Sequence, residues 1–135
     1  MKDLVNIYIL FIRSILEQSC VIWHSSITEG ESDDLERVQK VCLKIILKEK
    51  YECYDHALEV TGLENLIDRR KQLCLNFAKK CVKNETTKSM FPLNPSGYNQ
   101  VTRNAEKFDV QYCRTDRLAK SAIPYLQTLL NQYYK

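Results

Sequence analysis

Residues that break helices and form tight turns are scarce in this sequence, which holds three glycines and three prolines among its 135 residues. Sandwiches and barrels join many short strands through turns that are rich in these two residues. The scarcity therefore favours long helices joined by few loops. A chain of this length is also expected to bury one core and to form one domain. We predict a mostly α fold, a helical bundle of four or five helices with one short strand.

The first predicted helix runs from Leu4 to Trp23. Its apolar residues recur at steps of three and four and so mark one helical face: Val5, Ile9, Ile12, Leu16, Cys20 and Trp23. Other apolar residues lie off that face: Ile7, Leu10, Phe11, Ile15 and Ile22. We expect this helix to be buried nearly all round, because apolar residues on every side need packing partners.

A second helix is predicted to begin after Thr28, which can form a capping box with Glu31, or after Ser32, which precedes two aspartates. The residues expected to face the core keep the three-and-four spacing: Leu35, Val38, Val41, Cys42, Ile45 and Ile46. The residues expected to face solvent are Glu36, Arg37, Gln39, Lys40 and Lys44.

Two further helices complete the predicted bundle of residues 1–84. A short helix is predicted over Tyr54–Thr61, because Gly62 suits the left-handed position that ends a helix. A long helix is predicted from Leu66 to Asn84. Its expected core residues share one face: Leu66, Leu73, Cys74, Phe77, Ala78 and Cys81.

The C-terminal part of the chain contains the predicted loop and strand. Residues 85–106 hold two of the prolines and one glycine, which is typical of a loop. Apolar and polar residues alternate near 107–113, which predicts one short strand. A final helix is predicted from about Ser121, with Pro124 in its first turn. We expect residues 107–135 to form the short strand and this helix, packed on the bundle.

The net charge of +3 is unevenly distributed along the chain. Residues 1–63 carry seven basic and eleven acidic groups, whereas residues 64–135 carry thirteen basic and six acidic groups. The polar face of the long helix presents four basic residues that could follow a nucleic-acid backbone: Arg69, Lys79, Lys80 and Lys83. A solvated surface explains the same residues equally well. No aromatic residue interleaves with these charges on the polar face, so base stacking is not predicted.

Arg70 interrupts the apolar face of the long helix, one turn after Leu66. A guanidinium is rarely buried unless carboxylates or carbonyl oxygens accept its hydrogen bonds. We therefore predict a buried ion pair, with Glu17 or Glu36 as partner. The alternative is phosphate binding, to which Arg69 and Lys71 would contribute.

Neither of two candidate catalytic motifs is supported by its context. The adjacent Asp33 and Asp34 could hold metal ions, but they fall in the first turn of a helix, where carboxylates interact favourably with the helix dipole. Cys53 and His56 could bind zinc or act as nucleophile and base, but no second pair completes four ligands. His24, the only other histidine, is expected to cap a helix or face solvent. The sequence predicts no metal site and no catalytic residue.

The six cysteines and the N-terminal sequence indicate in which cellular compartment the protein is located. The cysteines form no Cys-X-X-Cys pair, which disfavours a metal knuckle. The apolar run from Leu4 to Ile12 is too short to span a bilayer, and Glu17-Gln18-Ser19 lacks the small residues of a signal-peptide cleavage site. We expect an intracellular protein, cytoplasmic or nuclear, with reduced thiols and no membrane partner.

Short segments found in order along nearly the whole chain resemble a known family. They are Ile12-Arg13-Ser14-Ile15-Leu16-Glu17, Val21-Ile22-Trp23-His24-Ser25-Ser26, Leu35-Glu36-Arg37-Val38-Gln39-Lys40, Gly62-Leu63-Glu64-Asn65-Leu66, Arg69-Arg70, Phe77-Ala78-Lys79-Lys80-Cys81, Phe91-Pro92, Arg114-Thr115, Ser121-Ala122-Ile123-Pro124 and Leu130-Asn131. Together they are similar to the C-terminal region, thumb and post-palm, of a non-LTR retrotransposon reverse transcriptase.

The resemblance implies that residues 1–84 are thumb-like and would help to hold an RNA template and a DNA primer. The sequence has no Tyr-X-Asp-Asp hairpin, and the resemblance covers no palm, fingers or endonuclease domain. We therefore expect a non-enzymatic fragment with no cofactor and no small-molecule substrate. Its expected partners are the RNA or DNA backbone or the upstream polymerase domain. The alternative is a helical protein-interaction module derived from this region, which binds no nucleic acid and meets its partner through the first helix.

Overall fold

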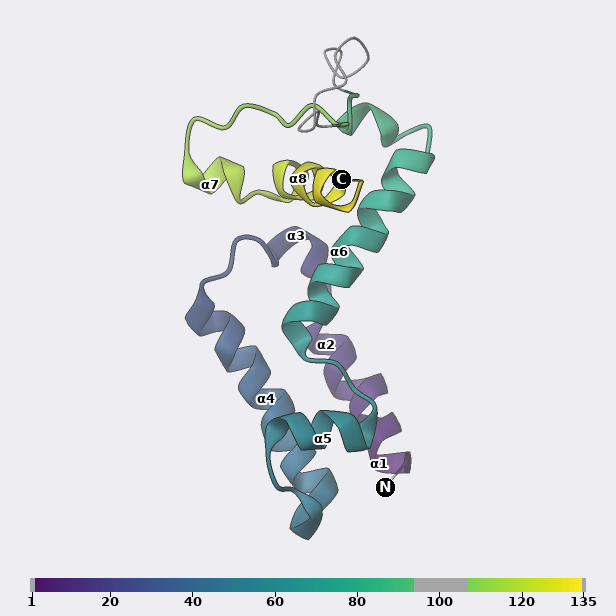
Figure 1. The fold of residues 1–135 in the computed structure, drawn as a ribbon, viewed down its shortest axis with the longest axis vertical. Coiled ribbons are helices and arrows are strands. Elements are labelled where there is room, and N and C mark those ends of the chain that lie inside the picture. The colour runs from purple at the N-terminus through teal and green to yellow at the C-terminus, as the bar shows by residue number, and fades with distance from the viewer. Residues whose placement is uncertain (1, 94–106, 135) are drawn as a thin grey trace. The chain divides into compact units, whose positions relative to one another are not determined.

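The computed structural model describes residues 2–93 and 107–134 of the chain. Most of these residues are helical and none of them belongs to a sheet, which confirms the prediction of a mostly α fold (Figure 1). The chain forms two compact units. Unit 1 comprises Met1–Cys20 and Ile27–Lys71, and unit 2 comprises Val21–Ser26 and Gln72–Lys135. The long helix predicted as part of the N-terminal bundle therefore contributes residues to both units.

Unit 1 contains the N-terminal helices. In chain order they are α1 (Lys2–Ile7), the π-helical segment η1 (Tyr8–Arg13), α2 (Ser14–Leu16), α4 (Glu29–Leu47), the 3-10 turn η2 (Lys48–Lys50), α5 (Tyr54–Thr61) and the first part of α6 (Leu66–Lys83). The capping box that the sequence predicts at Thr28 and Glu31 begins α4. Gly62, with a φ of 68°, ends α5 in the left-handed conformation, as predicted. The start of α4 and the end of α5 are thus fixed by local chemistry.

The helix predicted from Leu4 to Trp23 is interrupted. Helix α2 ends at Leu16, and the chain becomes helical again only in α3 (Cys20–Trp23). Ser19 lies between them with a φ of 53°, a left-handed value that is uncommon for a residue other than glycine. The segment Glu17–Ser19 carries no apolar side chain that packing could hold in a helix. The prediction of one uninterrupted helix was therefore wrong.

The N-terminal helical segment is also less buried than predicted. Val5 and Tyr8 lie in the core of unit 1, together with residues of α4, α5 and the following loop: Leu43, Leu47, Ala57 and Leu63. The apolar residues on its other sides are exposed: Leu4, Ile7, Leu10, Phe11 and Ile15. Within unit 1 the segment packs on one side only, so the expectation of burial nearly all round was wrong.

Helix α4 turns toward the core a face that only partly matches the one predicted. Leu35, Cys42 and Ile46 are partly buried, and Cys42 and Ile46 pack against the core of unit 1, as predicted. Val38, Val41 and Ile45 were expected inside and are exposed, with Ile45 at 65%. Glu36 and Gln39 were expected outside and are buried, at 6% and 0% exposure. Spacing alone could not distinguish these two faces, because Leu43 and Leu47 continue the stripe of Glu36 and Gln39 at helical intervals.

Hydrogen bonds explain why Glu36 and Gln39, two polar residues of α4, are buried. The Gln39 side chain accepts a hydrogen bond from the Tyr8 hydroxyl and donates to Tyr54 Oη at 2.8 Å and to the Glu64 carbonyl at 3.0 Å. The Glu36 carboxylate accepts from the Tyr54 hydroxyl and from the Leu66 N–H. Buried polar groups are tolerated when such partners are present. This network links η1, α4, α5 and the start of α6.

Unit 2 is built around α6 and the C-terminal helix α8 (Ala122–Tyr133). Its further elements are the 3-10 turn η3 (Lys88–Met90) and α7 (Asp116–Ala119). The core combines residues of α6, α8 and the segments beside them: Cys74, Ala78, Cys81, Phe91, Phe108, Leu126, Leu129 and Leu130. Pro124 lies in the first turn of α8, as predicted, where its missing N–H costs no hydrogen bond. The predicted loop of residues 85–106 is described only up to Leu93.

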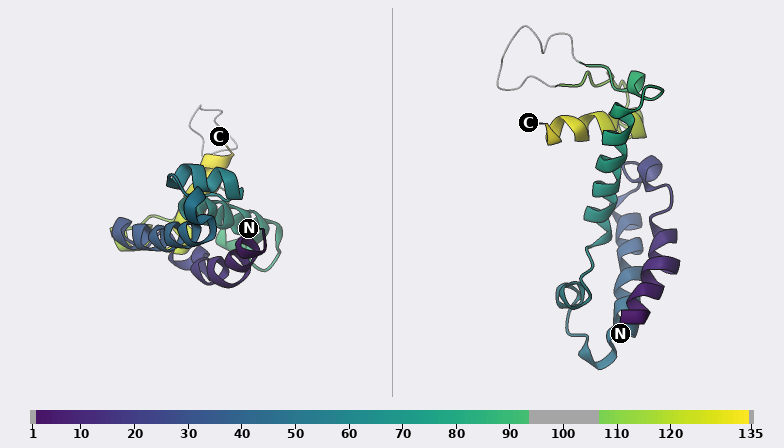
Figure 2. Two further views of the ribbon diagram at one scale, coloured as in Figure 1. Left: turned by 90° about the horizontal axis from the view of Figure 1, so that it is seen from below. Right: turned by 90° about the vertical axis from the view of Figure 1, so that its right-hand side faces the viewer.

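The strand predicted near 107–113 is reduced to one antiparallel bridge, between Leu93 and Phe108, within the part of the chain that the structure describes. Two amide side chains of α8 bind the backbone of this segment instead. Figure 2 shows the segment running beside α8. Asn131 binds both the N–H and the carbonyl of Phe108, and Gln127 accepts from the Gln111 N–H at 3.1 Å. Side chains of a helix therefore bind this backbone where a neighbouring strand would have bound it.

Candidate nucleic-acid interface

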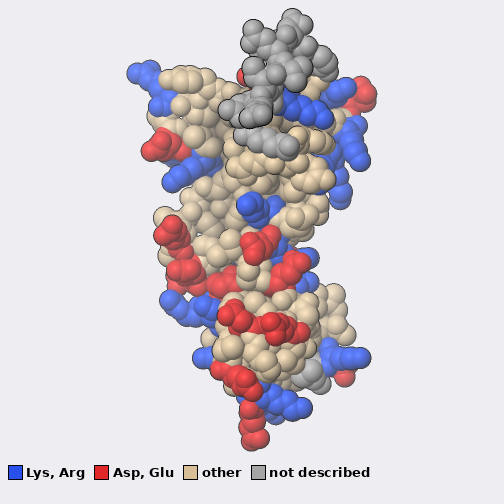
Figure 3. Space-filling view, in the orientation of Figure 1, with Lys and Arg blue, Asp and Glu red and all other residues tan. Residues whose placement is uncertain are grey.

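The two units have opposite net charges. Unit 1 carries ten basic and thirteen acidic residues, a net charge of −3, whereas unit 2 carries ten basic and four acidic residues, a net charge of +6. On the face drawn in Figure 3, acidic side chains gather over the α4 region of unit 1, and basic side chains gather near the end of α6 in unit 2. A polyanion is therefore attracted to unit 2.

The structure does not group all four predicted backbone-binding residues in one unit. Lys79, Lys80 and Lys83 lie in the last turns of α6, which belong to unit 2, whereas Arg69 belongs to unit 1. Arg69 is already paired, since its Nε lies 2.8 Å from Glu17 Oε1. The same carboxylate oxygen lies 3.7 Å from Arg13 Nε. Arg69 therefore holds α6 against the end of α2 and is a poor candidate for a phosphate contact.

The lysines at the end of α6 differ in their surroundings. Lys80 and Lys83 are exposed, whereas Lys79 is partly buried. Lys79 Nζ lies 3.3 Å from the centroid of the Tyr133 ring, a cation–π contact that joins α6 to the end of α8. The contact leaves the ammonium charge in place.

A second lysine and a second tyrosine adjoin this contact. Lys107 Nζ lies 4.0 Å from the centroid of the Tyr134 ring, and the rings of Tyr133 and Tyr134 meet edge to face with centroids 5.2 Å apart. We call Lys79, Lys107, Tyr133 and Tyr134 the tyrosine–lysine cluster. No sequence pattern indicates this cluster, because Tyr133 lies more than fifty positions after Lys79. Only the packing of α8 on α6 brings aromatic rings to these charges.

Arg70 is fully buried, as its apolar neighbours in the sequence suggested. Its Nη2 donates a hydrogen bond to Ser32 Oγ at 2.7 Å. The two carboxylates considered as its partners are bound elsewhere: Glu17 contacts Arg69, and Glu36 contacts Tyr54 and Leu66. The ion pair of Arg70 with a carboxylate remains a prediction.

The other candidate motifs have structural contacts. Asp34 forms an exposed ion pair with Arg37, with Oδ1 and Nη1 2.9 Å apart. Cys53 caps α5, its Sγ accepting the His56 N–H at 3.4 Å. The ring of His24 meets the ring of Tyr125 edge to face at 5.8 Å. Within residues 2–93 and 107–134, no group of three or more Cys, His, Asp or Glu side chains is placed to hold a metal ion. None of the six cysteines, all of which lie in the described residues, forms a disulfide.

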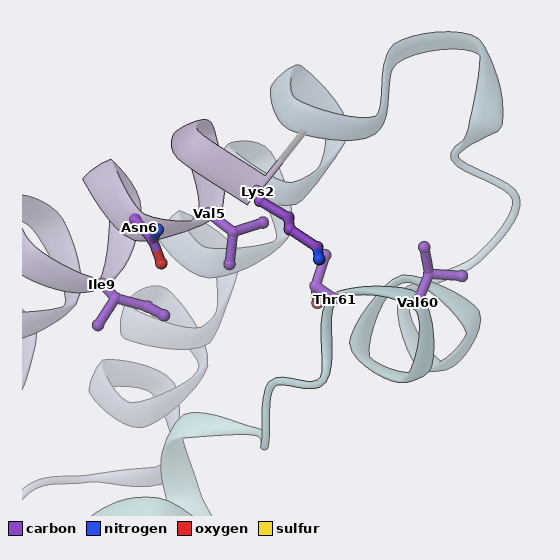
Figure 4. Close-up of a pocket in the computed structure, with 6 residues that line it drawn as sticks. All are labelled: Lys2, Val5, Asn6, Ile9, Val60 and Thr61. Atoms are coloured by element: carbon purple, nitrogen blue, oxygen red, sulfur yellow. The ribbon is translucent and has the colours of Figure 1, made fainter.

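Two shallow depressions in unit 1 offer little chemistry. One lies between the N-terminal helical segment and α5 and is lined by Lys2, Val5, Asn6, Ile9, Val60 and Thr61 (Figure 4). Lys2 is its only charged lining residue, so it holds no acid–base pair. The other is an apolar groove between the N-terminal segment and α4, lined by Leu4, Ile7, Tyr8, Ile12, Cys42, Ile45 and Ile46. The groove fits a protein surface better than a polar substrate.

Among the helices of the described residues, none combines the length and the apolar character needed to cross a membrane. Comparison of the chain with protein-family models, with curated proteins and with solved structures found no match in any of the three.

Proposed function

We propose that this chain is the non-catalytic C-terminal region of a non-LTR retrotransposon reverse transcriptase and that unit 2 binds the phosphate backbone of a nucleic acid. The observation that carries the proposal is the concentration of positive charge in unit 2, with Lys79, Lys80 and Lys83 in the last turns of one helix. Clustered lysines on one helix face neutralise phosphates without reading bases. The binding should therefore be independent of sequence.

The structure changes the number of phosphate contacts that the proposal requires. Arg69 is held by Glu17, which leaves the three lysines of α6. Three contacts on B-form DNA give a slope of about −2.7 in a plot of log affinity against log salt concentration. Four contacts would have given about −3.6.

A salt titration tests the proposal. Anisotropy of a labelled duplex of random sequence would be measured from about 50 mM salt upward. The Lys79→Ala/Lys83→Ala variant should lower the slope by about two units. The matched control is Lys44→Ala/Lys50→Ala, which removes the same charge from exposed positions of unit 1 and should leave the slope unchanged. Absence of binding by the unmodified protein at about 50 mM salt, where phosphate contacts are strongest, would reject the proposal.

The second candidate function is a protein-interaction module, and the exposed apolar surface of unit 1 favours it. Phe11 and Ile15 on the N-terminal segment and Ile45 on α4 are each at least 65% exposed, and Ile45 also lines the apolar groove. Extended apolar surface on a protein commonly marks a contact with another protein. In the reverse-transcriptase interpretation the partner is the upstream polymerase domain. Sedimentation of the isolated chain before and after Phe11→Ser/Ile45→Ser tests this surface: loss of self-association in the variant supports the module.

A further inference from the structure

The tyrosine–lysine cluster combines two features that binding of unpaired nucleotides requires. Single-stranded nucleic acid is bound by aromatic rings on which bases stack, beside cations that contact the backbone. Tyr133 and Tyr134 are 54% and 46% exposed, so a large part of each ring lies open to solvent. Lys79 and Lys107 each hold an ammonium within 4.0 Å of the centroid of one of these rings.

We propose that the tyrosine–lysine cluster binds single-stranded RNA or DNA by stacking a base on Tyr133, with Lys79 and the other lysines at the end of α6 contacting the adjoining phosphates. The inference rests on the proposed function, because it assigns the kind of nucleic acid that unit 2 prefers. It adds a contact to bases that the phosphate contacts of α6 do not require.

The geometry makes Tyr133 the stacking residue and Tyr134 its support. The Tyr134 ring packs against the buried Phe108 at a centroid distance of 5.9 Å, which fixes it to the core of unit 2. The more exposed Tyr133 ring meets it edge to face. Lys79 covers one face of the Tyr133 ring. A base that stacks on the other face finds a ring held in place from two directions, which reduces the entropy lost on binding.

Charge near the rings supports the same occupant. The last turns of α6 bring Lys80 and Lys83 within one helical turn of Lys79, and both are exposed. A lysine that contacts a ring retains two or more N–H donors for a phosphate oxygen. Stacking tolerates every base, because each base has a π face, so this binding should show little sequence preference.

The test separates base stacking from phosphate contacts by means of three labelled probes. They are an oligothymidylate of about 20 nucleotides, an abasic strand with the same number of phosphates, and a duplex of the same length. The protein variants are Tyr133→Ala, Tyr133→Phe and, as the matched control, Tyr112→Ala, which removes an 88% exposed tyrosine that is not part of the cluster. Circular dichroism would establish that each variant is folded.

The unmodified protein should bind oligothymidylate at least about fivefold more tightly than the abasic strand, which is the smallest gain expected from one stacked base. Tyr133→Ala should abolish this preference while leaving the affinity for the abasic strand and the duplex unchanged. Tyr133→Phe should retain the preference because the ring remains, and Tyr112→Ala should also retain it.

Two results would overturn the inference and are distinguishable from failure of the proposed function. Equal affinity of the unmodified protein for oligothymidylate and the abasic strand rejects stacking, and this comparison needs no variant. An equal loss on all three probes in Tyr133→Ala also rejects it. In both cases salt-dependent duplex binding would leave the proposed function standing, whereas failure to bind any probe would reject both.

Discussion

Asn131 holds the backbone of Phe108 by two hydrogen bonds: its Oδ1 accepts from the Phe108 N–H at 2.9 Å, and its Nδ2 donates to the Phe108 carbonyl at 3.0 Å. The pattern is the one that a neighbouring strand would make. Asn131 is buried, as is the Phe108 side chain. A helix side chain therefore substitutes for the missing strand and fixes a core residue of unit 2.

Replacing Asn131 by alanine should lower the free energy of unfolding by about 2–4 kcal/mol, because two buried backbone groups lose their partner. Urea unfolding followed by circular dichroism measures the change. Gln132→Ala, at the adjacent exposed position of the same helix, is the matched control and should change it by less than about 0.5 kcal/mol. A loss below about 1 kcal/mol in Asn131→Ala would show that water replaces the amide.

Unit 1 should lose stability at high pH because of the tyrosines that bind Gln39 and Glu36. Burial raises the pKa of Tyr8, and burial together with the hydrogen bond to Glu36 raises the pKa of Tyr54. Each hydroxyl thus ionises at higher pH when folded than when unfolded. The resulting stabilisation is complete below pH about 10, the ordinary tyrosine pKa, and is lost as the pH rises through the folded pKa.

The Tyr8→Phe/Tyr54→Phe variant isolates this effect. It should be less stable than the unmodified protein at neutral pH, because Gln39 and Glu36 lose hydroxyl partners. Its stability should also fall less steeply above pH about 10. Denaturant midpoints measured across that range provide the comparison. Identical slopes in the two proteins would contradict the assignment of the effect to these two tyrosines.

Removal of the Arg70 side chain tests whether a buried carboxylate compensates the charge of its guanidinium. If a buried carboxylate pairs with Arg70, then Arg70→Ala should cost about 3–5 kcal/mol of unfolding free energy. A double-mutant cycle with Ser32→Ala measures how much of this unfolding free energy comes from the hydrogen bond to the Ser32 hydroxyl. A cost near 1 kcal/mol that is fully accounted for by the coupling to Ser32 would exclude the buried ion pair.

All six cysteines should react with a thiol reagent after denaturation without reductant, because each is a free thiol in the structure. Counting adducts by mass spectrometry gives the result directly. A protein purified without reducing agents that lacks two adducts would contain a disulfide, and the expectation of an intracellular location would then fail.

Local chemistry explains which parts of the fold were predictable. Helix α5 ends where predicted because Gly62 supplies the left-handed residue after its last turn. Helix α4 begins where the Thr28 and Glu31 side chains bind each other's backbone. These signals act over three or four residues and are complete in the sequence. The same holds for Pro124, whose position relative to the start of α8 needs no distant partner.

The buried face of α4 shows what local chemistry leaves open. Two stripes of helical spacing lie on this helix, and three residues of the more apolar one, Val38, Val41 and Ile45, are exposed. Gln39 becomes a core residue only because Tyr8 and Tyr54, from distant positions, supply its hydrogen-bond partners. The spacing of apolar residues ranks the faces of a helix by hydrophobicity. It cannot identify hydrogen-bond partners that folding brings near from distant positions.

The sequence by itself determined the helical class, most helix limits and the accumulation of positive charge toward the C-terminus, because these follow from composition and from interactions between near neighbours. The tertiary structure alone decided that Arg69 is paired with Glu17, that Asn131 replaces a strand for Phe108, and that Tyr133 lies against Lys79. Each of these contacts joins residues more than twenty positions apart. Such pairs form only when the packing of a whole unit offsets the entropy of bringing them together.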